Sequence, residues 1–483
     1  MRRNLPVTLV AVSISLAACG SSTAPATTEG SKEDVSLPAP RAVCGPGSRP
    51  ETDMQGRVTQ ADHDSGRAAA GFTCNTELVG QFINDNAPTS VAGFKVERYV
   101  DSSGHECAYY DSTRLFPENV LSGELGVNVL DMSNPAEPVR SARLITPAML
   151  SPHESLVVSQ QRGVLAAVLG NIVFGPGVVD VYDLKEDCRN PVLKSSLPVG
   201  VLGHESGMSP DGMTFWSASN AAPTLTAVDI SNTTLTRPLV TTGIYSHGLS
   251  ISADGNRAYV AGGSTTPEDF IGGGKDYPAL FILDTSEVQA RKPSPKIRVI
   301  SRLAWHNITI PQNAIPITIK GHPYLVEIDE FATNGVSKLP SGNGVRVGAA
   351  RIIDIGDETQ PKVISDLRLE VHQPENRPTV ADEGRGARVV GGYAGHYCNV
   401  PTRVDPTIVA CSMLLSGLRV FDIRDPHHPR EVAYFNAPLS KRPNSVNSAV
   451  SSPSFVPERK EIWYTDITTG FYAVRVTNGA WPD

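Results

Sequence analysis

One short phrase, an apolar strand that ends in Asp, recurs along the chain and constrains its fold more than any other feature. Its six copies are residues 126–131, 177–183, 225–229, 279–284, 350–354 and 417–422. A short turn follows the Asp, often with Pro, as in Asp425-Pro426. A strand–turn–strand unit repeated at intervals of several tens of residues is typical of the blades of a β-propeller. The phrase therefore predicts an all-β repeat protein, in which each Asp caps the turn that follows it.

The segment from Ser246 to Leu303 shows a complete unit. It contains apolar alternating stretches at 246–252, 257–261, 279–286 and 298–303, and an Asp-Gly turn joins the first two. Asp-Gly between alternating apolar runs is a strong signal for a tight hairpin. The segment therefore predicts one four-stranded blade.

The last unit supplies only three strands before the chain nearly ends, at 451–456, 461–466 and 470–476. Residues 77–84, near the other end, resemble 431–436, which is the fourth strand of the sixth blade. We therefore expect the N-terminal strand to complete the last blade and to close a ring of seven blades over 77–476, with the first blade starting near Phe94. Closure removes the exposed strand edges of an open array.

The first residues have the pattern of a targeting segment. Arg2 and Arg3 precede an apolar stretch, and Leu16-Ala17-Ala18-Cys19-Gly20 resembles the lipobox of a bacterial lipoprotein signal. The resemblance implies removal of 1–18 and a lipid on Cys19 that anchors the chain to a membrane; the alternative is an ordinary secretory signal. Either reading places the protein outside the cytoplasm, at the cell surface or in the periplasm. We expect 19–43 to be a flexible tether, 44–76 a Cys-flanked irregular segment and 477–483 a short tail.

Six cysteines remain after Cys19, an even number that suggests disulfides in an oxidising compartment. Cys398 and Cys411 lie on strands expected to be neighbours, so they are predicted to pair. The partners of Cys44, Cys74, Cys107 and Cys188 stay open.

The repeat resembles a known family. Its Gly-x-x-x-x-Asp-x-x-x-Pro-x-x-Pro phrase and alternating strands look like LVIVD-repeat proteins, and 252–261 is similar to the wider YVTN-type propeller repeat. The resemblance spans roughly 77–476 and implies a bacterial extracytoplasmic propeller. It leaves the activity open, because propellers host unrelated functions.

Histidines open the first strands of five units: His153, His204, His247, His306 and His396. Counting to the next turn puts them in one register, with Val96 and Ser452 at the same place in the first and seventh blades. The innermost strand of a blade lines the central channel, so these imidazoles are expected to meet at one channel mouth. Imidazole is a good ligand for copper, zinc or iron, and Glu154 and Glu205 follow two of the histidines as supporting groups or ligands. Two alternatives are a structural role, in which each imidazole hydrogen-bonds the backbone of the next blade, and direct binding of a small ligand.

Two functions from different classes follow. Long insertions at 113–125, 170–177, 262–278, 331–348 and 372–395 fall on the face that carries the histidines. They favour a recognition module for a protein or glycan. The alternative is a metal-dependent oxidoreductase or hydrolase. Copper-dependent methanethiol oxidases resemble this arrangement in outline, although their paired-His motif is absent from the channel strands here.

Other classes are disfavoured. A net charge of −8 without basic runs argues against nucleic-acid binding, and Gly-x-Ser-x-Gly is absent. We expect a monomer.

Overall fold

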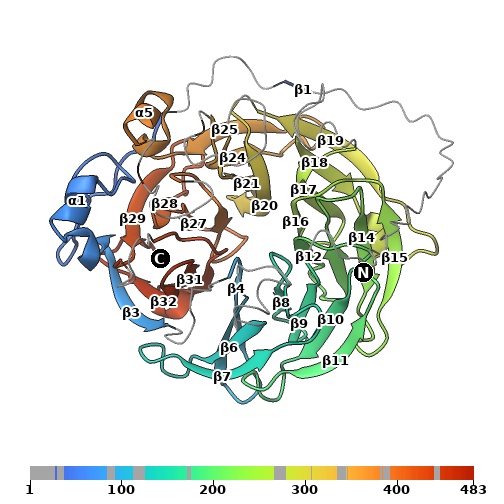
Figure 1. Ribbon diagram of the computed structural model, residues 1–483. Coiled ribbons are helices and arrows are strands. Elements are labelled where there is room, and N and C mark those ends of the chain that lie inside the picture. Colours follow the sequence, from blue (N-terminus) through green and yellow to red (C-terminus); the bar gives the residue numbers. More distant parts are fainter. Residues whose placement is uncertain are drawn as a thin grey trace, which may run out of the picture.

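The computed structural model describes residues 28–29, 37–83, 93–111, 126–170, 176–265, 279–305, 307–333, 344, 346–380, 383, 392–439 and 447–483. Seven of the sheets that these residues form are blades of antiparallel strands arranged in a ring around a central channel, which is the predicted seven-bladed β-propeller (Figure 1).

Each blade runs from an inner strand at the channel to an outer strand at the rim. Blade 1 consists of β4 (Val96–Val100), β5 (Glu106–Tyr110), β6 (Val127–Asp131) and β7 (Val139–Leu144). Blade 2 consists of β8 (Val157–Ser159), β9 (Val164–Val168), β10 (Val179–Asp183) and β11 (Val192–Leu197). Blade 3 consists of β12 (Ser206–Met208), β13 (Thr214–Ser217), β14 (Leu225–Asp229) and β15 (Arg237–Thr242). Blades 4 and 5 consist of β16 (Gly248–Ile251), β17 (Arg257–Gly263), β18 (Ala279–Asp284) and β19 (Arg298–Ala304); and β20 (Ile310–Ile319), β21 (His322–Glu330), β24 (Ala350–Asp354) and β25 (Lys362–Leu367). Blades 6 and 7 consist of β26 (Tyr397–Asn399), β27 (Ile408–Ser412), β28 (Leu418–Asp422) and β29 (Arg430–Asn436); and β30 (Ser454–Val456), β31 (Glu461–Asp466), β32 (Gly470–Val476) and β3 (Thr76–Phe82).

Short helices and strands lie outside the four strands of each blade. They are β1 (Thr28–Glu29), β2 (Phe72–Cys74), β22 (Ala332–Thr333), β23 (Arg346–Val347), α1 (Gln60–Asp64), α4 (Ser286–Gln289), α5 (Arg377–Val380), η1 (Ala68–Ala70), η2 (Glu370–His372), η3 (Pro374–Asn376) and η4 (Pro457–Arg459). β1 adds in parallel to β19, and β2 adds to the outer edge of β29.

The ring closes as predicted. β3 pairs antiparallel with β32 over the whole of both strands, from Thr76 opposite Val476 to Phe82 opposite Phe471. The N-terminal strand thus supplies the fourth strand of blade 7, and the first and last parts of the propeller hold each other in place.

The recurrent Asp residues cap turns, as the sequence predicts. In all six copies of the phrase the carboxylate accepts the backbone N–H of the residue two positions later, at 2.8–3.1 Å. This Asx turn ends each third strand in the same way and directs the chain into the fourth.

Three disulfides are present: Cys44–Cys74, Cys107–Cys188 and the predicted Cys398–Cys411. Cys398 and Cys411 are directly opposite on β26 and β27. Cys44–Cys74 closes the segment that carries α1, which lies outside the ring beside blades 6 and 7 (Figure 1). Three disulfides are typical of a protein that works outside the cytoplasm. Within the described part of the chain, no helix has the length and apolar character needed to span a bilayer.

The hydrophobic core lies between neighbouring blades. One cluster, for example, joins Trp216 of blade 3 to Leu249 and Val260 of blade 4. Every blade is therefore fixed by its neighbours on both sides, and this fixes where the inner strands meet at the channel.

Candidate metal centre

The strand pairing defines which residues share a level in the channel. Gly248 pairs with Ala261, Asn313 with Ile328, and Tyr397 with Ser412. In each of these blades the turn-capping Asp on the third strand pairs with a residue on the second strand. The second-strand partner named above lies four residues after that residue in all three blades. The residues before Gly248, Asn313 and Tyr397 therefore occupy equivalent positions.

The same pairing extends to all seven blades and gives two layers. The histidine layer consists of Phe94, Glu154, His204, His247, Gln312, His396 and Ser451. The lysine layer, one residue further along each inner strand, consists of Lys95, Ser155, Glu205, Gly248, Asn313, Tyr397 and Ser452.

The layers correct the register obtained by counting to the turns. Phe94 and Ser451, rather than Val96 and Ser452, occupy the histidine layer in blades 1 and 7. In blade 5 the place belongs to Gln312, at a bulge in β20, while His306 lies outside the described residues. In blade 2 it belongs to Glu154. Counting residues back from the turn gave the wrong register because the number of residues between the histidine layer and the turn differs between blades. A bulge in the inner strand also adds a residue that the position of the turn does not reveal.

Imidazoles and carboxylates nevertheless converge. Nε2 of His247 lies 3.3 Å from Glu330 and 3.6 Å from Glu154, and Nε2 of His396 lies 3.2 Å from Glu330 and 3.7 Å from Glu154. Nε2 of His204 lies 3.2 Å from Glu154. All five side chains are buried. Glu330, which ends β21, gave no sequence signal, because it stands on a second strand and outside the repeated pattern.

Backbone carbonyls fix the imidazole tautomers. Nδ1 of His247 lies 2.9 Å from the Pro311 carbonyl, and Nδ1 of His396 lies 2.5 Å from the Val450 carbonyl. A carbonyl only accepts, so both Nδ1 atoms carry protons and donate. Both bonds reach the next blade, as the structural alternative predicts. They leave each Nε2 facing the carboxylates. Burial keeps Nε2 of His247 unprotonated with a lone pair, whereas Nε2 of His396, whose pKa Glu330 raises, can carry a proton and donate it to that carboxylate.

His153 and His204 complete the cluster on the blade 2 side. Their ring centroids are 4.4 Å apart, and those of His204 and His247 are 4.9 Å apart. Among the described residues, Nδ1 of His204 and Nδ1 of His153 have no hydrogen-bond partner, whereas Nε2 of His204 faces Glu154. The backbone of His153 has a φ of 52°, in the left-handed region. Residues other than Gly seldom adopt this conformation, and such strained residues are concentrated at functional sites.

Aromatic rings pack against the cluster. Phe94 lies edge-on to His153 with centroids 4.6 Å apart and contacts His396 at 5.5 Å, while Phe331 lies 5.5 Å from His396 on another side. These rings lower the local dielectric and therefore strengthen charge interactions among the imidazoles and carboxylates.

Burial and mutual charge set the protonation of the group. Burial lowers the pKa of His247, and burial together with the charge of His204 lowers the pKa of His153 to about 3. Burial opposes protonation of His396 too, but the hydrogen bond and charge of Glu330 outweigh it and raise its pKa. Burial would raise the pKa of Glu154, yet the charges of His153 and His204 hold it well below its ordinary value.

This donor set suits a first-row transition ion. Ligands 2.0–2.2 Å from one ion stand roughly 3 to 4.4 Å apart, and the nitrogen–oxygen distances here fall in that range. Imidazole nitrogen favours copper, zinc, iron or nickel over calcium and magnesium, which prefer oxygen alone. Two carboxylates with neutral imidazoles carry two negative charges, which a divalent ion balances.

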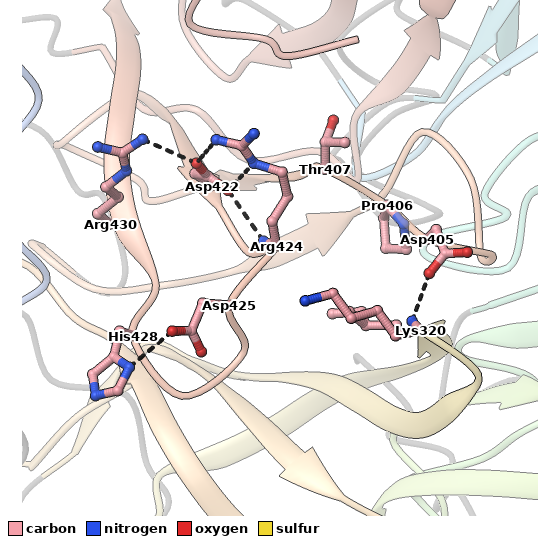
Figure 2. A pocket seen from close by; sticks show the side chains of 10 residues that line it. Lys320, Asp405, Pro406, Thr407, Asp422, Arg424, Asp425, His428 and Arg430 are labelled. Atoms are coloured by element: carbon pink, nitrogen blue, oxygen red, sulfur yellow. Dashed lines mark hydrogen bonds and ion pairs between the residues drawn. The ribbon is translucent and has the colours of Figure 1, made fainter.

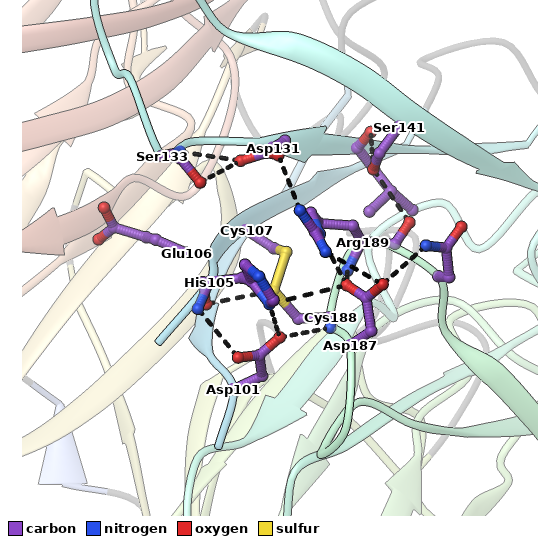
Figure 3. Close-up of a disulfide and its surroundings, with 12 residues drawn as sticks. Asp101, His105, Glu106, Cys107, Asp131, Ser133, Ser141, Asp187, Cys188 and Arg189 are labelled. Carbon is purple, nitrogen blue, oxygen red and sulfur yellow. Dashed lines mark hydrogen bonds and ion pairs between the residues drawn. A yellow bond between two sulfur atoms is a disulfide. The ribbon is translucent and has the colours of Figure 1, made fainter. Parts of the chain in front are cut away.

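A second cluster, Asp101, His105 and Asp187, lies beside the Cys107–Cys188 disulfide (Figure 3). Its oxygens are already used: Asp101 accepts the backbone N–H of Cys188 and the imidazole N–H of His105, and Asp187 binds Arg189. We interpret this cluster as a structural contact that holds blades 1 and 2 together.

A polar hollow of about 560 Å³ lies between blades 5 and 6 (Figure 2). Five of its charged side chains pair within it: Asp422 binds Arg424 and Arg430, and Asp425 binds His428. Apart from Ile319 at the far end of β20, its lining comes from turns and from the ends of β28 and β29, so it is separate from the histidine layer.

Comparisons with known proteins add little. No family model matches the chain, and no curated protein matches its sequence. Similar solved structures include a putative 6-phosphogluconolactonase from Bacteroides fragilis NCTC 9343 (10% identity, TM-score 0.45, covering 81% of this chain and 87% of that chain). A second putative 6-phosphogluconolactonase, from Bacteroides uniformis ATCC 8492, is 13% identical with a TM-score of 0.46, covering 70% of this chain and 84% of that chain. The β-propeller domain of Myceliophteria thermophila Cps50 (Swd1) is 12% identical with a TM-score of 0.48, covering 81% of this chain and 99% of that chain. Such distant likenesses carry no statement about activity, and the propeller assignment stands on the strand pairing itself.

Proposed function

We propose that this chain is a metal-dependent enzyme whose centre is held by Glu154, His247 and Glu330, with His204 and His396 beside them. The observation that carries the proposal is a pairing of acceptors: Nε2 of His247 faces Glu154 and Glu330 while its Nδ1 is committed to a carbonyl. Two lone pairs at this distance repel unless a proton or a metal ion lies between them. Nε2 of His204, 3.2 Å from Glu154, places a further imidazole nitrogen beside the same carboxylate.

The chemistry follows from the ion. Three protein ligands would leave positions for water or substrate on the ion, so a redox ion would support an oxidoreductase and zinc a hydrolase. Recognition by the insertion-rich face stays a prediction, because those insertions lie largely outside the described residues. The LVIVD-type family and the lipid anchor on Cys19 are part of the proposal and rest on the sequence resemblances alone.

The test is elemental analysis of the purified mature protein, followed by titration of metal-free protein with manganese, iron, copper and zinc. We expect about one equivalent of a transition ion, and loss of uptake in His204→Ala/His247→Ala. His322→Ala is the control, because His322 lies at a turn and pairs with Asp354. A wild-type protein that takes up none of the four ions would overturn the proposal.

A further inference from the structure

A polar cavity of about 370 Å³ occupies the channel on the side of the short turns. The inner strands line it with hydroxyl, amide and charged groups, among them Lys95, Glu97, Ser206, Ser250, Asn313 and Asn399. Its volume lies near the lower end of the range for small-molecule sites. A cavity of this kind accepts a small hydrophilic molecule and excludes a polymer.

The lysine layer lies between this cavity and the histidine layer. Nζ of Lys95 binds Glu205 at 2.6 Å and lies 5.1 Å from the centre of the Tyr397 ring. Asn313 donates a second hydrogen bond to the same oxygen of Glu205 at 3.2 Å. Gly248 makes this arrangement fit, because a β-carbon there would overlap Glu205.

The lysine layer retains unused hydrogen-bonding capacity. Among the described residues, Oε2 of Glu205 and the hydroxyl of Tyr397 have no hydrogen-bond partner, although both are buried. The ammonium group of Lys95 has three donors, and Glu205 takes one. Lys95 also lines the cavity, so it can donate to an acceptor on a molecule within it.

The two layers are adjacent. Lys95 follows Phe94, Glu205 follows His204 and Tyr397 follows His396. One residue of strand advances about 3.3 Å, so a molecule bound at Lys95 is one residue step from the histidine layer.

We infer that this cavity is the entry route and binding pocket for the reactant of the proposed centre, a small hydrophilic molecule that presents an acceptor oxygen or an anionic group to Lys95. This inference rests on the proposed function and adds to it the face of entry, the size of the reactant and the residue that binds it.

The experiment uses the full mature chain loaded with Co²⁺, and azide as the probe. Azide binding to the ion changes the visible spectrum, so its rate and affinity are read directly. Val157 lines the cavity on β8 and is half-buried, which makes it suitable for a removable block. Val157→Cys is folded first and then alkylated with a bulky maleimide. The unlabelled variant and maleimide-treated wild type are the controls.

We expect the label to slow azide association at least tenfold, and the controls to match untreated wild type. We also expect Lys95→Met to weaken azide binding at least fivefold while Co²⁺ remains bound, and Lys95→Arg to retain most of the affinity. Azide that binds the labelled protein at the wild-type rate would overturn the inference. A chain that takes up no Co²⁺ would instead refute the metal centre itself, so the two failures are distinguishable.

Discussion

His396 and Glu330 face each other across 3.2 Å, from the inner strand of blade 6 and the second strand of blade 5. Nδ1 of the same imidazole is held by the Val450 carbonyl of blade 7. One histidine thus joins three blades, and its remaining nitrogen is directed at a buried carboxylate. A single residue thus fixes the positions of three blades and holds Glu330 beside the proposed metal centre.

Metal binding should stabilise the fold. A ligand at a hundred times its dissociation constant adds about 2.7 kcal/mol to the free energy of unfolding, because it binds only the folded state. We expect wild type to gain this amount, measured by urea unfolding with and without the ion. Glu330→Gln should gain much less, because it removes one of the two charges that balance the ion. Glu77→Gln on the rim strand β3 is the control, and an equal gain in both variants would contradict the assignment.

Lys95 and Glu205 should be strongly coupled. Burial raises the pKa of Glu205 to about 8 even beside Lys95, so the pair is fully charged only above that pH. Breaking a buried ion pair from one side leaves an uncompensated charge, so at roughly pH 9 Lys95→Met should lower the free energy of unfolding by about 3 kcal/mol or more. Lys95→Met/Glu205→Gln should lose less than the sum of the single changes, by about 2 kcal/mol, because no charge is then left alone. A double-mutant cycle in urea measures this, and simple additivity would argue against the pair.

The disulfide between blades 1 and 2 should contribute more to the free energy of unfolding than the one within blade 6. Cys107 and Cys188 are 81 residues apart, whereas Cys398 and Cys411 are 13 apart. In the chain-entropy account, the longer loop contributes about 4.5 kcal/mol and the shorter about 3 kcal/mol. Cys107→Ala/Cys188→Ala should therefore unfold at lower urea than Cys398→Ala/Cys411→Ala, and the opposite order would show that loop length does not decide the effect here.

The turn-capping carboxylates should make the propeller sensitive to acid. The Ser286 hydroxyl and backbone N–H lower the pKa of Asp284. A lowered folded-state pKa gives stability that is present above the unfolded value of about 3.9 and is lost as the pH falls through the folded value. Asp284→Asn should therefore be less stable than wild type at pH 7, by less than about 1 kcal/mol because solvent screens the turn, and the difference should vanish near pH 2. Urea unfolding across pH 2–7 checks this, with Glu186→Gln at an exposed position as the control.

The repeated Asp phrase, the Asp-Gly turn and the similarity of 77–84 to 431–436 sufficed to predict seven blades and their closure. These are local features, and each blade forms by pairing of strands that are near in sequence. Cys398 and Cys411 were predictable for the same reason, since they lie on successive strands. Four of the five predicted histidines lie together at the channel, and the fifth, His306, lies outside the described residues.

What the sequence by itself determined about this protein is its periodicity, and with it the strands, the turns and the histidines at the start of inner strands. Only the tertiary structure decided which residues share a level in the channel. Closing the ring brings strands from distant blades within hydrogen-bonding distance, and a bulge such as the one beside Gln312 shifts a side chain by one place without any mark in the sequence. For this reason Glu330 and Lys95, which no repeat pattern indicates, lie next to the histidines that the pattern did predict.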